Sequence, residues 1–182
     1  MLVRDSRDED VPAITAIYAH WVRHGRASFE LDPPCEEEMA RRRRAVLDQG
    51  YDHLVAEAGE RLVGYAYAAP FRTRPAYRFT VENSVYVAPG LHRAGAGRAL
   101  MEELIARCTA KGFRLMVAVI GDSANAASIG LHVAMGFRHA GLLPGTGWKH
   151  GGWVDTVLMA RPLGEGTRTA PEERPAFSPR CR

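Results

Sequence analysis

The stretch that decides the fold is VAPGLHRAGAGRAL, residues 87–100. A Pro-Gly turn follows an apolar run. Two glycines one residue apart, Gly95 and Gly97, then lead into a helical pattern over residues 95–110. Glycines at the start of a helix let backbone N–H groups approach an anion closely, and the helix dipole favours negative charge there. The stretch therefore predicts a strand, an anion-binding loop and a helix.

Two nucleotide-binding interpretations of this loop are disfavoured by the residues around it. A P-loop requires the pattern G-x-x-x-x-G-K-[ST], which does not occur in the chain. A dinucleotide-binding loop requires a tiny residue where Leu100 stands, and three strands are already expected before this loop. An ordinary strand–turn–helix junction that binds no anion remains open from the loop alone.

The composition is that of a single domain that needs no cross-links. The chain has 182 residues, of which 46% are hydrophobic, and this suffices for an ordinary core. Its three cysteines, Cys35, Cys108 and Cys181, include no C-x-x-C pair that would indicate zinc or redox chemistry. The net charge of +3 is small for a nucleic-acid surface, and no apolar run has the length of a signal peptide or membrane span. We therefore expect a cytoplasmic protein with no nucleic-acid or membrane partner.

Hydrophobic periodicity and turn residues predict an alternation of helices and strands. Helices are expected over residues 8–22, 35–50, 95–110 and 123–137. Strands are expected over residues 53–58, 61–71, 77–89, 113–121 and 151–163, with an extended segment at 28–34. This order predicts a mixed α/β sheet. Residues 164–182 are rich in proline, glycine and charge, and we expect them to form a disordered tail.

Two segments carry a resemblance to a known family. HRAGAG, residues 92–97, resembles the Q/R-x-x-G-x-G/A signature with which the GNAT superfamily of N-acetyltransferases binds the pyrophosphate of coenzyme A, although His92 stands where Gln or Arg is usual. NAASIGLHVAMGF, residues 125–137, resembles a second segment of that family, with His132 where a Tyr is common. Together with TVENSVYV and WKHGGWVD, these segments are similar to the phosphinothricin and methionine sulfoximine acetyltransferase branch. The resemblance spans residues 1–163, which we expect to form the acetyltransferase domain.

The resemblance implies a fold and a co-substrate. The implied fold is a central mixed, mostly antiparallel sheet with a splayed strand pair, flanked by helices on both faces. Acetyl-CoA is the implied co-substrate, no metal is implied, and the chain is expected to form a homodimer. The residues expected to bind the cofactor are Val85, Tyr86, Val87, His92, Arg93, Ala94, Gly95, Ala96, Gly97, Arg98, Asn125 and Ser128.

Glu82 is the expected general base. In the strand TVENSVYV, alternation places it on one face together with Ser84 and Tyr86. A carboxylate inside a strand lies either on a wet face or in a cavity, where desolvation would raise its pKa and make it a better proton acceptor. The resemblance assigns the base role to this residue, whereas a surface or structural glutamate is the alternative. The resemblance also implies that the N–H of Val87 meets the thioester carbonyl and that this strand carries a bulge.

His132 is the second expected catalytic residue. The resemblance places it where the family's thiolate-facing side chain stands, so its imidazole could donate a proton to the leaving sulfur or help to deprotonate the amine. A lone histidine on a helix is more often structural, and this interpretation stays open. Asn125 is expected to hydrogen-bond the pantetheine arm, to cap the helix, or to do both.

The acceptor site is expected in two loops. Arg72 and Arg74 could fork onto the carboxylate of an amino acid, although solvated loop arginines are the alternative. Aromatic side chains that could shape the rest of the pocket are Phe29, Tyr77 and Trp148, and weaker site candidates are Lys149 and His150.

Three other features are interpreted as structural. His20 and His24 have the i,i+4 spacing of a helical metal pair but no further ligand accompanies them in sequence, so metal binding is disfavoured. The run Arg41–Arg44 could be a phosphate or nucleic-acid patch, but a helix face of paired charges explains it better. Cys108 lies on an apolar helix face and is expected in the core rather than as a nucleophile.

The predicted activity is direct transfer of acetyl from acetyl-CoA to the amine of a small amino-acid-like acceptor. Phosphinothricin, methionine sulfoximine or sulfone and related L-amino acids are the acceptors that the resemblance implies. One alternative is transfer to a protein N-terminus, a lysine or a polyamine, which a pair of acceptor-site arginines disfavours. The other is a coenzyme A-binding protein without catalysis.

Overall fold

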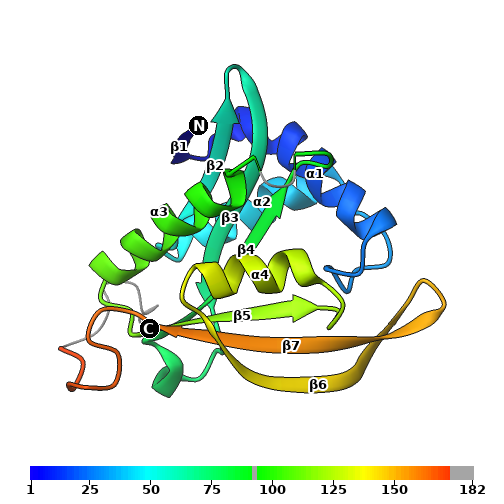
Figure 1. Cartoon of the computed structure of the whole chain (residues 1–182). Helices are drawn as coiled ribbons and strands as arrows, with labels where there is room; N and C mark the ends of the chain where they lie inside the picture. Colours follow the sequence, from blue (N-terminus) through cyan, green and yellow to red (C-terminus); the bar gives the residue numbers. More distant parts are fainter. Residues whose placement is uncertain (92–93, 173–182) are drawn as a thin grey trace.

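A computed structural model describes residues 1–91 and 94–172, which form a seven-stranded sheet flanked by helices (Figure 1). The order across the sheet is β1-β2-β3-β4-β5-β7-β6. The strands are β1 Leu2–Asp5, β2 His53–Ala58, β3 Arg61–Pro70, β4 Thr80–Val87, β5 Leu115–Gly121, β6 Arg138–Lys149 and β7 Gly152–Pro162. The predicted α/β class is confirmed.

The sheet is mixed, and its two directions meet at β4 and β5. This is the parallel pair, and the other neighbouring strands of the described residues run antiparallel. The β4–β5 pairing ends at Asn83 opposite Ala118, although β4 continues to Val87 and β5 to Gly121. The two strands therefore diverge beyond Asn83, as the predicted splayed pair requires.

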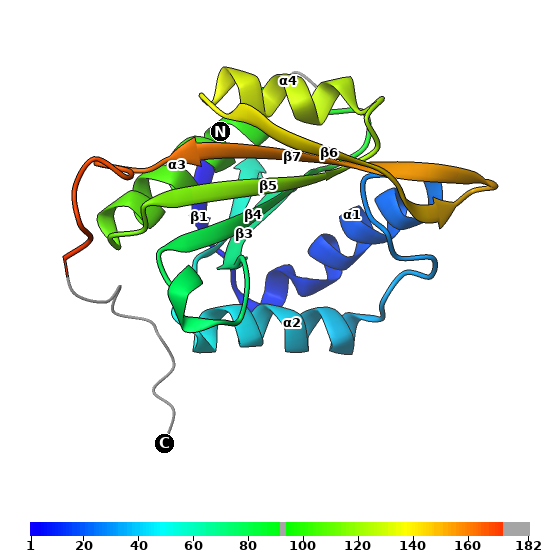
Figure 2. The same ribbon diagram turned by 90° about the horizontal axis from the view of Figure 1, so that it is seen from below.

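Helices cover both faces of the sheet (Figure 2). The α-helices of the described residues are α1 Val11–His24, α2 Glu36–Asp48, α3 Ala96–Ala110 and α4 Ala126–Ala134. One core cluster joins the sheet to α3 and α4, and a second joins it to α1 and α2. The apolar stripe predicted for residues 95–110, which includes Leu100, Leu104 and Cys108, is buried in the first cluster because it recurs at helical spacing. Two one-turn 3₁₀ helices, Asp8–Asp10 and Pro75–Tyr77, precede α1 and β4.

Two strands were not predicted. β1 is short, and β6 contains three glycines and a proline, so neither shows the alternation that marks a strand. β6 is held by its pairing with β7, which accommodates two register shifts. The segment WKHGGWVD contains the tight connection of the β6–β7 hairpin, with positive φ at His150 and Gly151. The segment at 28–34, expected to be extended, forms no strand.

The expected bulge in β4 was wrong. The register of β4 against β3 is unshifted from Val81 opposite Pro70 to Val87 opposite Gly64. Strict alternation therefore holds along β4, and the nearby register shift lies between β2 and β3, where Val63 of β3 is the extra residue opposite Ala56 and Glu57. Divergence from β5 opens the strand edge without a bulge.

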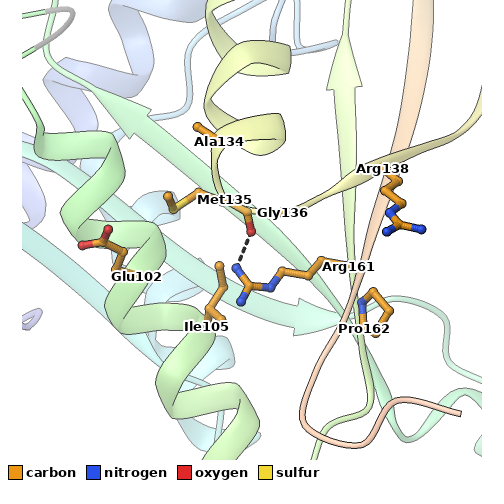
Figure 3. Close-up of a pocket in the computed structure, with 8 residues that line it drawn as sticks. All are labelled: Glu102, Ile105, Ala134, Met135, Gly136, Arg138, Arg161 and Pro162. Carbon is orange, nitrogen blue, oxygen red and sulfur yellow. Dashed lines mark hydrogen bonds between the residues drawn. The ribbon is translucent and has the colours of Figure 1, made fainter. Parts of the chain in front are cut away.

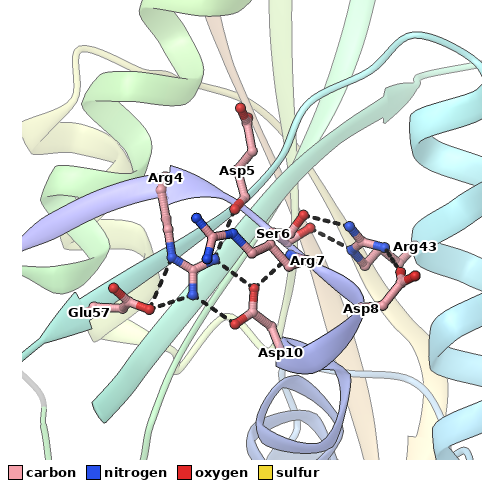
Figure 4. A network of polar contacts seen from close by, with 8 residues as sticks. All are labelled: Arg4, Asp5, Ser6, Arg7, Asp8, Asp10, Arg43 and Glu57. Atoms are coloured by element: carbon pink, nitrogen blue, oxygen red, sulfur yellow. Dashed lines mark hydrogen bonds and ion pairs between the residues drawn. The ribbon is translucent and has the colours of Figure 1, made fainter. Parts of the chain in front are cut away.

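A network of charged side chains attaches β1 to α1, α2 and β2 (Figure 4). Arg4 donates to both carboxylate oxygens of Asp10 at 2.8 Å and also contacts Glu57. Arg43 of α2 donates to the Ser6 hydroxyl at 2.7 Å. These bonds connect elements that are distant in sequence.

The arginine run on α2 is largely paired. Arg41 and Arg42 both donate to the carboxylate of Glu38 at 2.7 Å, and Arg43 lies 2.5 Å from Asp8. The paired-charge interpretation of this run therefore describes the structure better than a phosphate patch.

The segment after β7 has contacts with the domain. Arg114 donates to the Thr169 hydroxyl and to the Ala170 carbonyl, each at 3.2 Å. The rest of the expected tail, including Cys181, lies outside the described residues.

Candidate active site

Two adjoining cavities lie where β4 and β5 diverge. The larger, of about 640 Å³, lies between the ends of α3 and α4 and the edge of β4. The smaller, of about 50 Å³, lies between β4, β5 and α4. The residues that line both are Ala27, Val85, Tyr86, Asn125 and Ser128. The shared residues show that the two cavities adjoin at the split in the sheet, and we refer to them together as the hollow.

The start of α3 presents backbone donors to this hollow. Gly95 precedes the helix in the left-handed conformation, with φ of 85°, which a side chain would strain. The first N–H groups of a helix have no intrahelical acceptor, and within the described residues no side-chain hydrogen bond caps the start of α3. Gly97 lets the helix approach closely, because a Cβ there would lie 3.2 Å from Leu131 Cδ2 and 3.4 Å from Val87 Cγ2. Such an end binds an anion well.

Most of the predicted cofactor loop lies at the larger cavity. The predicted residues Gly95, Ala96, Gly97 and Arg98 line the larger cavity. Ala94 precedes them and donates its N–H to Leu91 O at 3.3 Å. His92 and Arg93 lie outside the described residues.

The edge of β4 presents backbone groups to the same hollow. Ala88 donates its N–H to Val63 of β3, so by alternation the N–H and C=O groups of Val85 and Val87 point to the opposite side, where β5 has diverged. Val87 O accepts a hydrogen bond from Trp21 Nε1 at 2.8 Å. An extended amide-containing chain could pair with this edge as a strand would.

Asn125 and Ser128 are the predicted cofactor residues on α4. Asn125 Oδ1 accepts a hydrogen bond from the Ser128 N–H at 3.1 Å, so this side chain caps the helix. Both residues line both cavities. The capping role is thus visible, and it leaves the side chain at the wall of the hollow.

Glu82 lies on the α1 and α2 face of β4. It shares that face with Ser84, which lines the smaller cavity, and with Tyr86, which packs into the core cluster of α1 and α2. Glu82 itself lines neither cavity and lies about 7 Å along the strand from Ser84. Burial raises the pKa of this half-buried carboxyl above its usual value, and the charge of Arg72 opposes that shift. The shift suits a proton acceptor.

His132 lies on the other face of the sheet. Its side chain lines the smaller cavity and is 2% exposed. Nδ1 is 2.8 Å from Ser128 O, and Nε2 is 3.1 Å from Asn83 Oδ1. Burial lowers the pKa of His132, although the bond to Ser128 O works in the opposite direction. The two predicted catalytic side chains therefore flank the split in the sheet from opposite faces.

The predicted acceptor residues are dispersed over exposed loops. Arg72 stacks on Phe71 with 4.3 Å between guanidinium and ring centre, and Tyr77 meets the same ring edge-on. Arg74 is exposed, and Phe29 packs instead against Gly147 of β6. Arg72 is connected to the site through its effect on the pKa of Glu82. The four predicted acceptor residues line neither of the cavities at the split.

Three further site candidates, Trp148 and the weaker Lys149 and His150, lie at the connection between β6 and β7. Lys149 is buried, and its Nζ donates to Ser28 O at 2.7 Å. Trp148 and His150 are exposed at the end of the hairpin. The structure therefore connects Lys149 to the loop that carries Phe29.

Several residues of the site were not predicted. Trp21 and Ala27 line the larger cavity, and Asn83 contacts His132. Trp21 lies within the helix expected over residues 8–22, and only its indole N–H, which needs an acceptor when buried, could have indicated a further role. Asn83 follows the glutamate in the same strand, but its orientation toward α4 depends on tertiary packing.

A third cavity, of about 670 Å³, contains none of the predicted site residues (Figure 3). It lies between α3, the end of α4 and the last residues of β7. Arg161 reaches across it and donates to the carbonyl of Met135, just after α4. This contact satisfies a carbonyl at a helix end, so the arginine has a structural function there.

The described residues contain no group of three His, Cys, Asp or Glu side chains that could hold a metal ion. Within the same residues, none of the helices combines the length and the apolar character needed to cross a bilayer.

The chain is similar to known acetyltransferases over almost its whole length. The sequence model described as "Acetyltransferase (GNAT) family" matches residues 15–137. A phosphinothricin N-acetyltransferase of Alcaligenes faecalis is 56% identical over 170 residues, which cover 93% of this chain and 86% of that protein. An L-methionine sulfoximine/L-methionine sulfone acetyltransferase of Pseudomonas paraeruginosa is 40% identical over 173 residues, which cover 93% and 98%.

A solved structure extends the similarity to three dimensions. The crystal structure of a phosphinothricin acetyltransferase from Sinorhizobium meliloti in complex with AcCoA superposes with a TM-score of 0.91 at 48% identity. The match covers 98% of this chain and 95% of that one. With the hollow at the split sheet and the open end of α3, these similarities establish that the chain belongs to the GNAT family and is an N-acetyltransferase with acetyl-CoA as its co-substrate.

Proposed function

We propose that the enzyme transfers acetyl directly to the amine of a small amino-acid-like acceptor, such as phosphinothricin, methionine sulfoximine or sulfone, or a related L-amino acid. The names of the two similar enzymes support this acceptor class. The observation that carries the mechanism is the split between β4 and β5, which has a candidate base on one face and a buried imidazole on the other. Transfer to a protein N-terminus, lysine or polyamine is not favoured.

The donor binds along the hollow at the split. Acetyl-CoA supplies an activated acetyl thioester. The N–H groups at the start of α3, from Ala96 to Arg98, hold its pyrophosphate without a metal. The edge groups of Val85 and Val87 pair with the pantetheine arm, and the N–H of Val87 is the expected partner of the thioester carbonyl. Asn125 and Ser128 border the same path. Holding both reactants in attack geometry contributes several kcal/mol in such reactions.

The two proposed catalytic side chains act from the two faces of the sheet. Glu82 accepts the proton of the attacking amine, directly or through water, on the α1 and α2 face. Its raised pKa improves that acceptance near neutral pH. His132 lies on the α4 face and serves the sulfur side of the thioester. Each side chain is thus dedicated to one reactant.

The acceptor approaches from the face of Glu82. Arg72 is the proposed partner of the acceptor carboxylate, since its charge already influences Glu82. Arg74 and Tyr77 extend from the same loop, and Phe29 is the fourth side chain proposed for the acceptor pocket. Amino acids with a free carboxylate are therefore expected to be preferred over amines without one.

A thiol-release assay with a panel of amines tests the acceptor class. The panel contains phosphinothricin, methionine sulfoximine, methionine sulfone, free lysine, a polyamine and a peptide with a free N-terminus. Release of coenzyme A with the amino-acid analogues and little with the polyamine or peptide is the expected outcome. If only the polyamine or peptide supports release, the proposed acceptor class is wrong.

Substitution of the proposed base tests the mechanism. Glu82→Gln keeps the shape of the side chain, and we expect kcat to fall by about 10² or more. The control is Glu60→Gln in the exposed β2–β3 turn, which should leave kcat unchanged. Calorimetric binding of coenzyme A should persist in both variants. Unchanged turnover in Glu82→Gln would remove the base assignment, and absence of turnover in the wild type despite coenzyme A binding would favour a non-catalytic protein.

Three further properties belong to this proposal. The enzyme acts as a homodimer. Its catalytic domain is residues 1–163, with a tail at 164–182. It is cytoplasmic, in keeping with free thiols at Cys35 and Cys108.

Truncation after Glu172 tests the assignment of the tail. It retains the partners of Arg114 and should leave kcat and melting temperature unchanged. A loss of activity on that truncation would place the last ten residues inside the functional unit.

A further inference from the structure

Asn83 and His132 form a buried polar pair at the wall of the smaller cavity. Asn83 is 5% exposed, and His132 is 2% exposed. The ring of His132 is fixed on a third side by Phe137, which meets it edge-on at 4.9 Å. Two polar side chains so deeply buried lower the stability of the fold unless their polar atoms form hydrogen bonds.

The hydrogen-bond partner of His132 Nδ1 determines where the ring proton lies. Nδ1 is 2.8 Å from Ser128 O, and a carbonyl oxygen only accepts. Nδ1 must therefore carry hydrogen. In a neutral imidazole Nε2 then holds a lone pair and can only accept.

The amide of Asn83 as placed conflicts with a neutral ring. Its Oδ1 is the atom 3.1 Å from His132 Nε2, so two acceptors face each other unless the ring is an imidazolium. Within the described residues, Nδ2 of the same amide is buried with no hydrogen-bond partner. The two amide ends are interchanged by a half-turn that leaves the shape of the side chain almost unchanged. That half-turn brings the unpaired donor to the nitrogen that needs one.

We propose that Asn83 is a positioning residue whose Nδ2 donates to Nε2 of His132 and holds this histidine as the neutral tautomer protonated on Nδ1. The surroundings favour the neutral ring. Apart from His132, the titratable group among the residues that line the smaller cavity is Tyr86, and no carboxylate lies there to stabilise an imidazolium. Burial acts in the same direction.

This arrangement specifies what His132 contributes to the proposed reaction, and it rests on that proposed function. A neutral ring whose lone pair is engaged by Asn83 is not a resting proton donor for the leaving thiolate. His132 instead forms a rigid, neutral wall of the site on the sulfur side of the thioester. The thiolate receives its proton by another route, such as from water. Asn83 acts through His132 and touches no substrate itself.

Nitrogen NMR of the free protein tests the tautomer directly. ¹⁵N-labelled histidine is incorporated, and the signals that disappear in His132→Gln are assigned to His132. At neutral pH we expect one protonated signal from Nδ1 and one pyridine-type signal from Nε2. Two protonated nitrogens, or protonation of Nε2 alone, would overturn the proposal. The measurement needs no turnover, so it remains decisive even if Glu82 is not the base.

Two substitutions test the positioning role. Asn83→Leu keeps the volume but removes the donor, so the Nε2 signal should move toward that of an unbonded nitrogen. In this variant kcat should fall roughly tenfold with little change in KM for acetyl-CoA. Asn83→Asp offers only acceptors when ionised, so it should protonate Nε2 and give two protonated nitrogen signals for His132 at neutral pH.

The exposed His139→Gln serves as the control and should change neither His132 signals nor kcat. If Asn83→Leu leaves both the Nε2 signal and kcat as in the wild type, Asn83 only fills space and the proposal fails. Melting temperatures of the variants show whether either result reflects loss of folding.

Discussion

Glu82 is the residue whose ionisation should set the lower pH limit of activity. Its pKa in the folded protein is raised by burial, and a base must be ionised to accept a proton. As the pH falls through that raised value the carboxyl becomes neutral, so kcat/KM should decline at a pH above the range of an ordinary glutamate.

Arg72 offers a way to move that limit. Its positive charge lowers the pKa of Glu82, so Arg72→Gln should raise the pKa further and shift the acid limb of kcat/KM to higher pH. Measuring kcat/KM against pH for the wild type, Arg72→Gln and the exposed Arg78→Gln checks this. Arg78→Gln should leave the midpoint in place. A shift of the Arg72→Gln midpoint to lower pH would contradict the assignment of this limb to Glu82.

Single residues of the site were predictable where they carry a local signal. Gly95 and Gly97 are required by backbone geometry, and Asn125 stands at a helix start, so motif and physics indicate them together. Asn83 and Trp21 have no such signal, because their partners, His132 and Val87, lie 49 and 66 residues away. The sequence pattern fixed which face of β4 each side chain occupies but not what it meets there.

At the scale of an element, the start of α3 should tolerate no side chain at Gly97. A Cβ there would already be 3.2 Å from Leu131 Cδ2, and the larger branches of valine would enter the hollow or push α4 away. Gly97→Val should raise the Kd and KM for acetyl-CoA roughly tenfold, the effect of about 1–3 kcal/mol of overpacking.

The control for this substitution lies on the same helix. Ala106 is exposed, so Ala106→Val changes helix propensity without reaching the hollow. Its acetyl-CoA affinity, measured by calorimetry, should match that of the wild type. Equal affinities of Gly97→Val and Ala106→Val would show that this end of α3 does not border the donor.

The junction of β1 and α1 should depend on the charge of Asp10. Burial alone would raise the pKa of this carboxyl, but hydrogen bonds from Arg4 and from the Arg7 N–H hold it below its usual value. Asp10→Asn weakens these bonds and should lower the free energy of unfolding by about 2 kcal/mol at neutral pH. The exposed Asp8→Asn should have little effect.

The stabilisation that Asp10 contributes should decrease on acidification. Because the folded pKa of Asp10 is depressed, its contribution is complete above the unfolded value and is lost as the pH falls through the folded one. The difference between wild type and Asp10→Asn in urea denaturation should therefore shrink below the pH range of an ordinary aspartate. A difference that stays constant on acidification would exclude the ion pair as its source.

Helices and strands whose apolar residues follow a clear pattern were predicted, whereas strands that depend on pairing with a neighbouring strand were not. The apolar stripes of α1 and α3 recur at helical spacing, and β5 is an almost unbroken apolar run bounded by turn residues. β6 has glycines and a proline where alternation would be needed, so only pairing with β7 makes it a strand. Propensity is a weak guide when a partner strand supplies the hydrogen bonds.

At the scale of the molecule, the proposed function assigns the two reactants to opposite faces of the split sheet. α3 and α4 lie on the face proposed for the donor pyrophosphate, and α1 and α2 lie on the face of Glu82. The general architecture could be predicted because the order of elements limits the possible sheets. The acceptor pocket could not, because its predicted residues come from loops that no periodicity describes.

The hairpin of β6 and β7 extends beyond the body of the domain and carries exposed apolar side chains (Figure 1). We call Leu142, Leu143, Trp148 and Trp153 the hairpin surface. Trp153 is 69% exposed and Trp148 57%, which is unusual for side chains of this size. β6 is also an edge strand, so its outer backbone groups can pair with another chain. A second copy of this chain is the occupant proposed above.

Charged substitutions on the hairpin surface should therefore separate the dimer. A double variant, Leu142→Arg with Trp153→Arg, places two positive charges in each copy of the surface, and a twofold interface would bring them together. Sedimentation should give twice the 20.0 kDa chain mass for the wild type and the single mass for the variant. Leu31→Arg is the matched control, because Leu31 is 67% exposed but lies outside the hairpin surface, and it should remain dimeric. A wild type that sediments as a monomer at all concentrations, or a double variant that stays dimeric, would show that the hairpin surface does not join two copies.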